Sequence, residues 1–134
     1  MTNQSKISFT WLAIALSLVM HTIMEISSHI FFPKPDAMVA KPGAEIPPIF
    51  HVIYISAMIL PMIVGFITLI TEKKIFKVIT FVYAILLVIL NAFHFVEQIS
   101  GNPSDISQVV LLLFVVVANV YLIIWLNKWQ KIDI

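Results

Sequence analysis

The chain has 134 residues, of which 60% are hydrophobic and only 11% are charged, and its formal net charge is +1. Ordinary soluble domains carry about 25% charged residues, and a soluble fold of this size exposes too much surface to hide so many apolar side chains. The small net charge argues against a nucleic-acid partner, and the absence of cysteine excludes disulfides, thiolate metal sites and c-type haem attachment. We therefore expect one integral membrane domain over residues 1–134.

Four apolar segments are long enough to cross a bilayer, which takes about 20 residues in a helix. Their predicted bounds are residues 8–32, 48–71, 76–99 and 106–126. The first segment is too long for the apolar part of a signal peptide, so we expect it to be retained. Pro61, with Gly65 one turn further on, predicts a kink in the second segment. Ser104 is the expected N-cap of the fourth.

The lysines predict the orientation of these spans. Six of them lie before the first span, between the second and third, or after the fourth, whereas only Lys34 and Lys41 lie on the other side. By the positive-inside rule, both termini are cytoplasmic. Short turns make neighbouring spans antiparallel. We predict an all-α, up-down-up-down four-helix bundle in the plasma (inner) membrane, in contact with the lipid bilayer.

Ionisable side chains are concentrated in the outer half of this bundle. All four histidines, together with Glu25 and Glu97, lie inside or at the edge of predicted spans. Such groups cost about 2.5–3.5 kcal/mol near the bilayer centre, so they usually mark function. Helical rise places His29, His51 and His94 in one layer ~5–8 Å inside the outer boundary. This pattern predicts a pocket that opens to the non-cytoplasmic side.

A transition-metal site, which could support catalysis on a membrane or periplasmic substrate, is the function that we favour for this pocket. Imidazole and carboxylate ligands suit zinc, copper or iron. The predicted ligands are Glu25, His29, His51 and His94, with Glu97 orienting a ligand or replacing one. A dinuclear site would also use His21. Tyr54, Asn91 and Gln98 lie at neighbouring levels and are the predicted ligand-binding residues of the pocket wall; no residue is assigned to catalysis.

Several other functions fit the same residues. His29 and His94 could hold a haem b between facing helices. A metal-free pocket could move protons or bind a lipid head group or a quinone, with Tyr54 as a proton donor. Polar side chains can also simply join helices by hydrogen bonds, which are worth about 0.6 kcal/mol each in membranes. A chain this small would then suit a non-enzymatic subunit of a larger membrane complex, or a homo-oligomer.

The segment His94-Phe95-Val96-Glu97-Gln98-Ile99-Ser100-Gly101-Asn102-Pro103 resembles the HXXEE group of small bacterial membrane proteins. That group shows His-x-x-Glu-Glu followed by a Gly-x-Pro turn, and Gln98 stands here in place of the second acid. The resemblance covers about ten residues around His94. It implies a polar site at the end of a membrane span in a bacterial protein, and it implies no particular reaction.

Overall fold

The computed structural model describes residues 2–31 and 45–131, apart from the side chain of His29, and nearly all of these residues are helical. The elements are α1 (Asn3–Phe31), α2 (Pro48–Tyr54), the π-helix η1 (Ile55–Ile59), α3 (Leu60–Ile70), α4 (Lys74–Gly101) and α5 (Ile106–Lys131). Together α2, η1 and α3 form the second span. The segment between the first two predicted spans, residues 33–47, falls largely on residues 32–44, which lie outside the described part of the chain.

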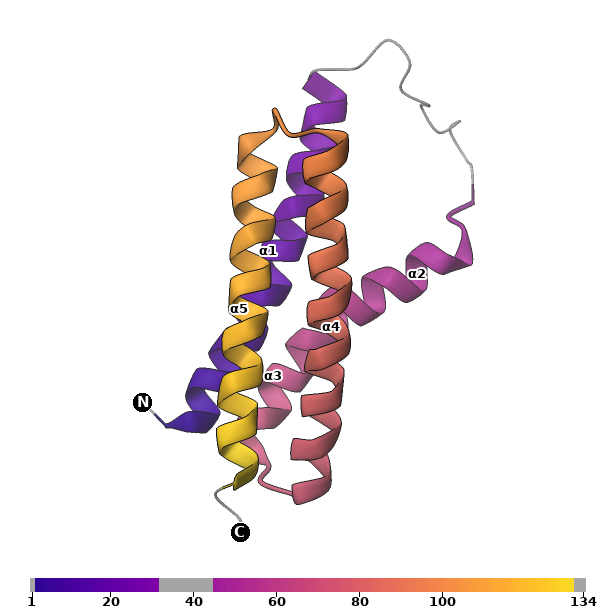
Figure 1. Cartoon of the computed structure of the whole chain (residues 1–134). Helices are drawn as coiled ribbons and strands as arrows, with labels where there is room; N and C mark the ends of the chain where they lie inside the picture. Colours follow the sequence, from indigo (N-terminus) through magenta and orange to yellow (C-terminus); the bar gives the residue numbers. More distant parts are fainter. Residues whose placement is uncertain (1, 32–44, 132–134) are drawn as a thin grey trace.

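The four spans run alternately up and down, and the two ends of the chain lie at the same end of the bundle (Figure 1). All four are long and apolar enough to cross a membrane. The predicted all-α, four-span architecture is therefore confirmed. The helices at the chain ends extend beyond the predicted spans, to Asn3 and to Lys131, because flanking polar residues can stay helical where the chain leaves the lipid. We call the end that carries the termini the inner end and the opposite end the outer end.

The core is built from seams of side chains spaced alternately three and four residues apart. On α1 the seam is Ile7, Trp11, Ile14, Leu18 and His21, all buried. The seam on α5 is also buried, and it comprises Gln108, Leu112, Val115, Asn119, Leu122, Leu126 and Trp129. This heptad spacing is that of helices crossing at about +20°. Accordingly, α5 packs between α1 and α4, and α3 packs on α1. Many large apolar side chains outside the buried positions are exposed, as lipid contact requires, for example Phe9, Leu16 and Phe93.

The second span is irregular just before Pro61, as the sequence predicts. In η1 the N–H of Leu60 bonds to the carbonyl of Ile55, five residues back. The next residue in this register, Pro61, has no N–H to give to the carbonyl of Ser56. The hydroxyl of Tyr83 on α4 donates to that carbonyl instead. On the N-terminal side of η1, α2 projects away from the bundle and has no buried residue (Figure 1).

Gly65 has a packing role rather than a part in the irregular stretch. A Cβ atom at this position would lie 3.2 Å from the Cβ of Trp11 and 3.3 Å from the carbonyl oxygen of Ser8. Glycine therefore lets α3 approach α1 closely, which is how small residues act at membrane helix interfaces. Nearby, the ring of Trp11 stacks on the ring of Tyr83 at a centroid distance of 5.2 Å.

Candidate functional site

Two histidines from different spans meet inside the outer half of the bundle. The Nε2 atoms of His21 on α1 and His94 on α4 lie 2.9 Å apart, which is a normal hydrogen-bond distance. The two rings are nearly perpendicular, with centroids 4.9 Å apart. His21 ends the buried seam of α1. On α4 the buried residues also alternate three and four apart and end at Asn91, three residues before His94; they are Lys77, Thr80, Ala84, Leu87 and Asn91. The same heptad pattern that builds the core therefore brings the two rings together.

In each of the two histidines the second ring nitrogen, Nδ1, also has a polar partner. The Nδ1 atom of His21 bonds to the Oε1 atom of Gln108 on α5, which can only accept, so this Nδ1 must carry a hydrogen. The amide of Gln108 is oriented by its Nε2, which donates to the backbone carbonyl of His21 at 3.3 Å. The Nδ1 atom of His94 faces a carboxylate oxygen of Glu97 at 3.4 Å. The carboxylate attracts a hydrogen at that nitrogen too.

These contacts limit how hydrogens can be placed between the two Nε2 atoms. With a hydrogen on Nδ1, a neutral His21 presents a lone pair at Nε2. The 2.9 Å contact is then a hydrogen bond in which Nε2 of His94 is the donor. His94 can donate either as the neutral tautomer with its hydrogen on Nε2, or as an imidazolium, which has a hydrogen on both nitrogens and can also donate to Glu97.

Exposure to solvent falls along the series of contacts that runs from Glu97 through His94 to His21. The side chain of Glu97 is 68% exposed and that of His94 is 42% exposed. His21 is 6% exposed, and Gln108 is buried beside it. The ordered series Glu97, His94, His21 thus leads from the surface into the core through groups that can each take a proton. Deeper in the bundle, the Nδ2 atom of the buried Asn91 has no hydrogen-bond partner among the described residues.

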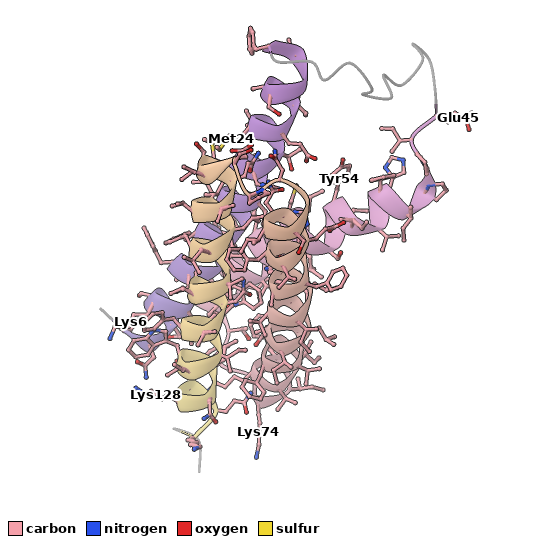
Figure 2. The ribbon with its side chains drawn as sticks, turned by 45° about the horizontal axis from the view of Figure 1, so that its top comes forward. Lys6, Met24, Glu45, Tyr54, Lys74 and Lys128 are labelled. Atoms are coloured by element: carbon pink, nitrogen blue, oxygen red, sulfur yellow. The ribbon has the colours of Figure 1, made fainter. Side chains whose placement is uncertain are left out.

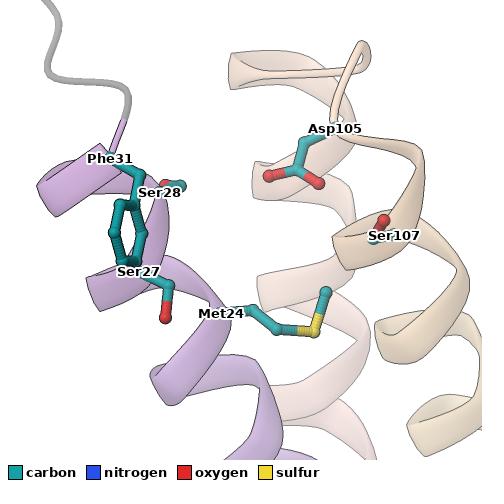
Figure 3. A pocket seen from close by; sticks show the side chains of 6 residues that line it. All are labelled: Met24, Ser27, Ser28, Phe31, Asp105 and Ser107. Carbon is teal, nitrogen blue, oxygen red and sulfur yellow. The ribbon is translucent and has the colours of Figure 1, made fainter.

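A pocket opens beside this site, between the end of α1 and the start of α5 (Figure 3). Its volume is about 370 Å³. Its lining residues are Met24, Ser27, Ser28, Phe31, Asp105 and Ser107. Asp105 connects it to the site, because its carboxylate accepts the backbone N–H of Gln108 at 3.2 Å. Asp105 is thus the N-cap of α5, and the prediction of Ser104 was wrong: the hydroxyl of Ser104 donates to the side chain of Asn102 instead.

The other predicted site residues are spread out. Glu25 is exposed on α1, and His29 lies two turns beyond His21 on the same helix, with its side chain outside the described part. His51 and Tyr54 are exposed on the projecting α2, where the ring of Tyr54 lies beside Phe50. Within the described residues, no group of three or more side chains that could hold a metal is assembled.

Asn91 and Gln98, the two predicted pocket residues on α4, differ in burial. Asn91 is buried one turn below His94, whereas Gln98 is partly exposed near the outer end of the helix. Of the predicted set, the structure thus brings His94 and Glu97 together and adds His21, which the sequence indicated only for a dinuclear site. Gln108 was not predicted as a site residue. The signal that could have found it is its place at the outer end of the α5 seam, level with the end of the α1 seam.

The fold and the site define a class: a four-span helical membrane protein with a hydrogen-bonded histidine pair in its outer half. Comparison of the chain with models of protein families, with curated proteins and with solved structures finds no match. The resemblance of the His94 segment to the HXXEE group therefore stays a prediction.

Proposed function

We propose that the protein is a membrane-embedded proton-binding protein, in which His21 and His94 share one proton that exchanges with the outer face through Glu97. The observation that carries this proposal is the 2.9 Å separation of the two Nε2 atoms while both Nδ1 atoms face acceptors. Such a separation suits an N–H donor on His94 and a lone pair on His21, and an imidazolium at His94 has a hydrogen both for this contact and for the contact to Glu97.

The position of Glu97 supports a path for that proton. Its exposed carboxylate lies beside His94 and can stabilise an imidazolium there by opposite charge. Histidine is suited to the exchange because its charge changes close to neutral pH. A protein of this kind acts as the proton-accepting part of a proton-coupled step in the membrane, either by itself or as a subunit of a larger complex.

A pH-jump experiment on the protein in lipid nanodiscs tests the path. The chain has no cysteine, so a pH-sensitive dye can be attached at Ser104→Cys, close to the outer end. After a light-induced release of protons, we expect rapid uptake in the parent and uptake slowed by at least about tenfold in Glu97→Gln, which removes the exposed acid. His51→Gln removes an exposed histidine outside the pair and should leave this phase intact. An unchanged rate in Glu97→Gln would exclude Glu97 as the route.

A transition-metal ion is the second candidate, and a specific observation favours it. Histidine ligands of metals usually hold their second nitrogen against a carbonyl or carboxylate, as His21 and His94 both do. Glu25 and His29 follow His21 on α1 at four-residue intervals and are the further ligands proposed for zinc, copper or iron. Haem b, for which the sequence suggests His29 and His94, is less favoured, because the Nε2 atom of His94 already lies 2.9 Å from the Nε2 atom of His21.

Elemental analysis separates the two candidates. The protein would be purified from membranes without a metal-affinity step and measured together with its absorption spectrum. A stoichiometric metal that is lost in His94→Ala would establish the metal site, and a Soret band would establish haem. A folded protein without metal or chromophore is the result that the shared-proton proposal expects.

A further inference from the structure

A second group of charged and aromatic side chains lies at the inner end of the bundle, far from the histidine pair. The Nζ atom of Lys6 on α1 lies 4.3 Å from the centre of the Trp125 ring, and the Nζ atom of Lys128 lies 4.8 Å from the same centre. Figure 2 shows Lys6 and Lys128 close together on one side of the bundle, with Lys74 apart from them. We call Lys6 and Lys128, which share the Trp125 ring, the inner-end lysine pair.

The two ammonium groups of this pair share an aromatic contact, and among the described residues they have no acidic partner. In the ranges 2–31 and 45–131, no carboxylate forms an ion pair with Lys6 or Lys128. The indole ring attracts each ammonium group, but it neutralises neither charge. Two like charges on one ring repel each other.

The location of the pair identifies the anion that fits it. A tryptophan near the end of a membrane span lies at the level of the lipid head groups, where its ring is apolar on one side and hydrated on the other. The lysine ammonium groups are then at the depth of the phosphates, and both donate hydrogen bonds that a phosphate oxygen accepts. A lipid without a head-group ammonium fits best, because it brings no positive charge toward the lysines.

We propose that Lys6, Trp125 and Lys128 form a binding site for the phosphate of an anionic phospholipid, in the leaflet at the inner end. The lipid phosphate lies between the two ammonium groups, and its acyl chains run along the apolar outer faces of α1 and α5. Because Lys6 and Lys128 belong to the first and last spans, the bound lipid also ties these two helices together at the chain ends.

The chain itself offers a matched control for testing this site. Lys73 and Lys74 also lie at the inner end, but no aromatic contact joins them to Trp125. The double variant Lys6→Gln/Lys128→Gln and the double variant Lys73→Gln/Lys74→Gln therefore remove the same charge from the same end. Lys6→Arg/Lys128→Arg keeps both charges and both ring contacts.

Native mass spectrometry of protein released from nanodiscs of phosphatidylglycerol and phosphatidylcholine measures the retained lipid. We expect the parent and the arginine variant to retain one phosphatidylglycerol, and Lys6→Gln/Lys128→Gln to bind it about tenfold or more weakly. The control pair should change binding by less than about twofold. Equal losses in both glutamine variants would show a general surface potential and overturn the proposal, as would equal retention of phosphatidylcholine by the parent.

Discussion

His21 is the buried member of the histidine pair, and its contacts make it the residue on which the outer half of the bundle most depends. It contacts Gln108 twice, once through its ring and once through its backbone carbonyl, and it contacts His94 through Nε2. Removing the ring leaves the buried amide oxygen of Gln108 without its donor.

His21→Ala should therefore lower the free energy of unfolding by about 1–3 kcal/mol, because a buried acceptor is left unsatisfied. His51→Ala removes an exposed side chain on α2 and should change it by no more than about 0.5 kcal/mol. Thermal unfolding in detergent, followed by tryptophan fluorescence, measures both variants. Equal stability of the two would mean that the His21 contacts contribute nothing to folding.

Gly65 and Gly101 allow a second comparison between like substitutions. At Gly65 a new methyl group would press on Trp11 and on the backbone of Ser8, whereas at Gly101 nothing lies within 4 Å. Gly65→Ala should cost about 1–3 kcal/mol of stability through overpacking, and Gly101→Ala should be close to neutral. If Gly65→Ala is as stable as its control, α1 and α3 are not closely packed at this point.

How much of the site the sequence could predict depends on the residue. His94 and Glu97 are three residues apart on one helix, so their proximity follows from helical geometry alone. The contact between His21 and His94 depends on the rotation of α1 and α4 about their own axes. Heptad spacing indicates this rotation only when the buried positions of each helix are followed to its outer end, where polar residues replace apolar ones. The predicted depth of His51 along its span matched that of His29 and His94. Depth alone, however, does not predict the direction in which α2 leaves the bundle.

At the level of elements, the second span is the one that departs from a regular helix. Two features of the sequence act together there: Pro61 removes a donor, and Tyr83 on another helix supplies one. The proline predicts an irregular helix, whereas the π-helical register and the partner of the freed carbonyl depend on tertiary packing. The other three helices follow their apolar runs closely, which is why their existence could be predicted and their exact ends could not.

Tyr83→Phe isolates the hydroxyl at this junction, because phenylalanine keeps the stacking on Trp11. We expect a loss of about 0.5–1.5 kcal/mol, the usual net value of one hydrogen bond. Tyr121→Phe, at an exposed position on α5, is the matched control and should be nearly neutral. The same unfolding measurement applies, and a neutral Tyr83→Phe would show that the Ser56 carbonyl does not need this donor.

At the scale of the whole molecule, the lysines predict that the histidine site faces the non-cytoplasmic side. All described lysines lie at the end opposite to the histidine pair. Single cysteines in this cysteine-free chain test the orientation. In intact cells, a membrane-impermeant maleimide should label Ser104→Cys, in the turn between α4 and α5, and should leave Glu72→Cys unlabelled until the cells are opened. The reverse pattern would place the site on the cytoplasmic side.

The central claim is that His21 and His94 share a proton, and nitrogen-15 NMR of the imidazoles in nanodiscs tests it most directly. A hydrogen bond between two nitrogen atoms transmits a measurable coupling from one nucleus to the other. We predict such a coupling between the Nε2 atoms of His21 and His94, and its disappearance in His94→Gln. Two uncoupled Nε2 signals in a folded, metal-free protein would contradict the claim.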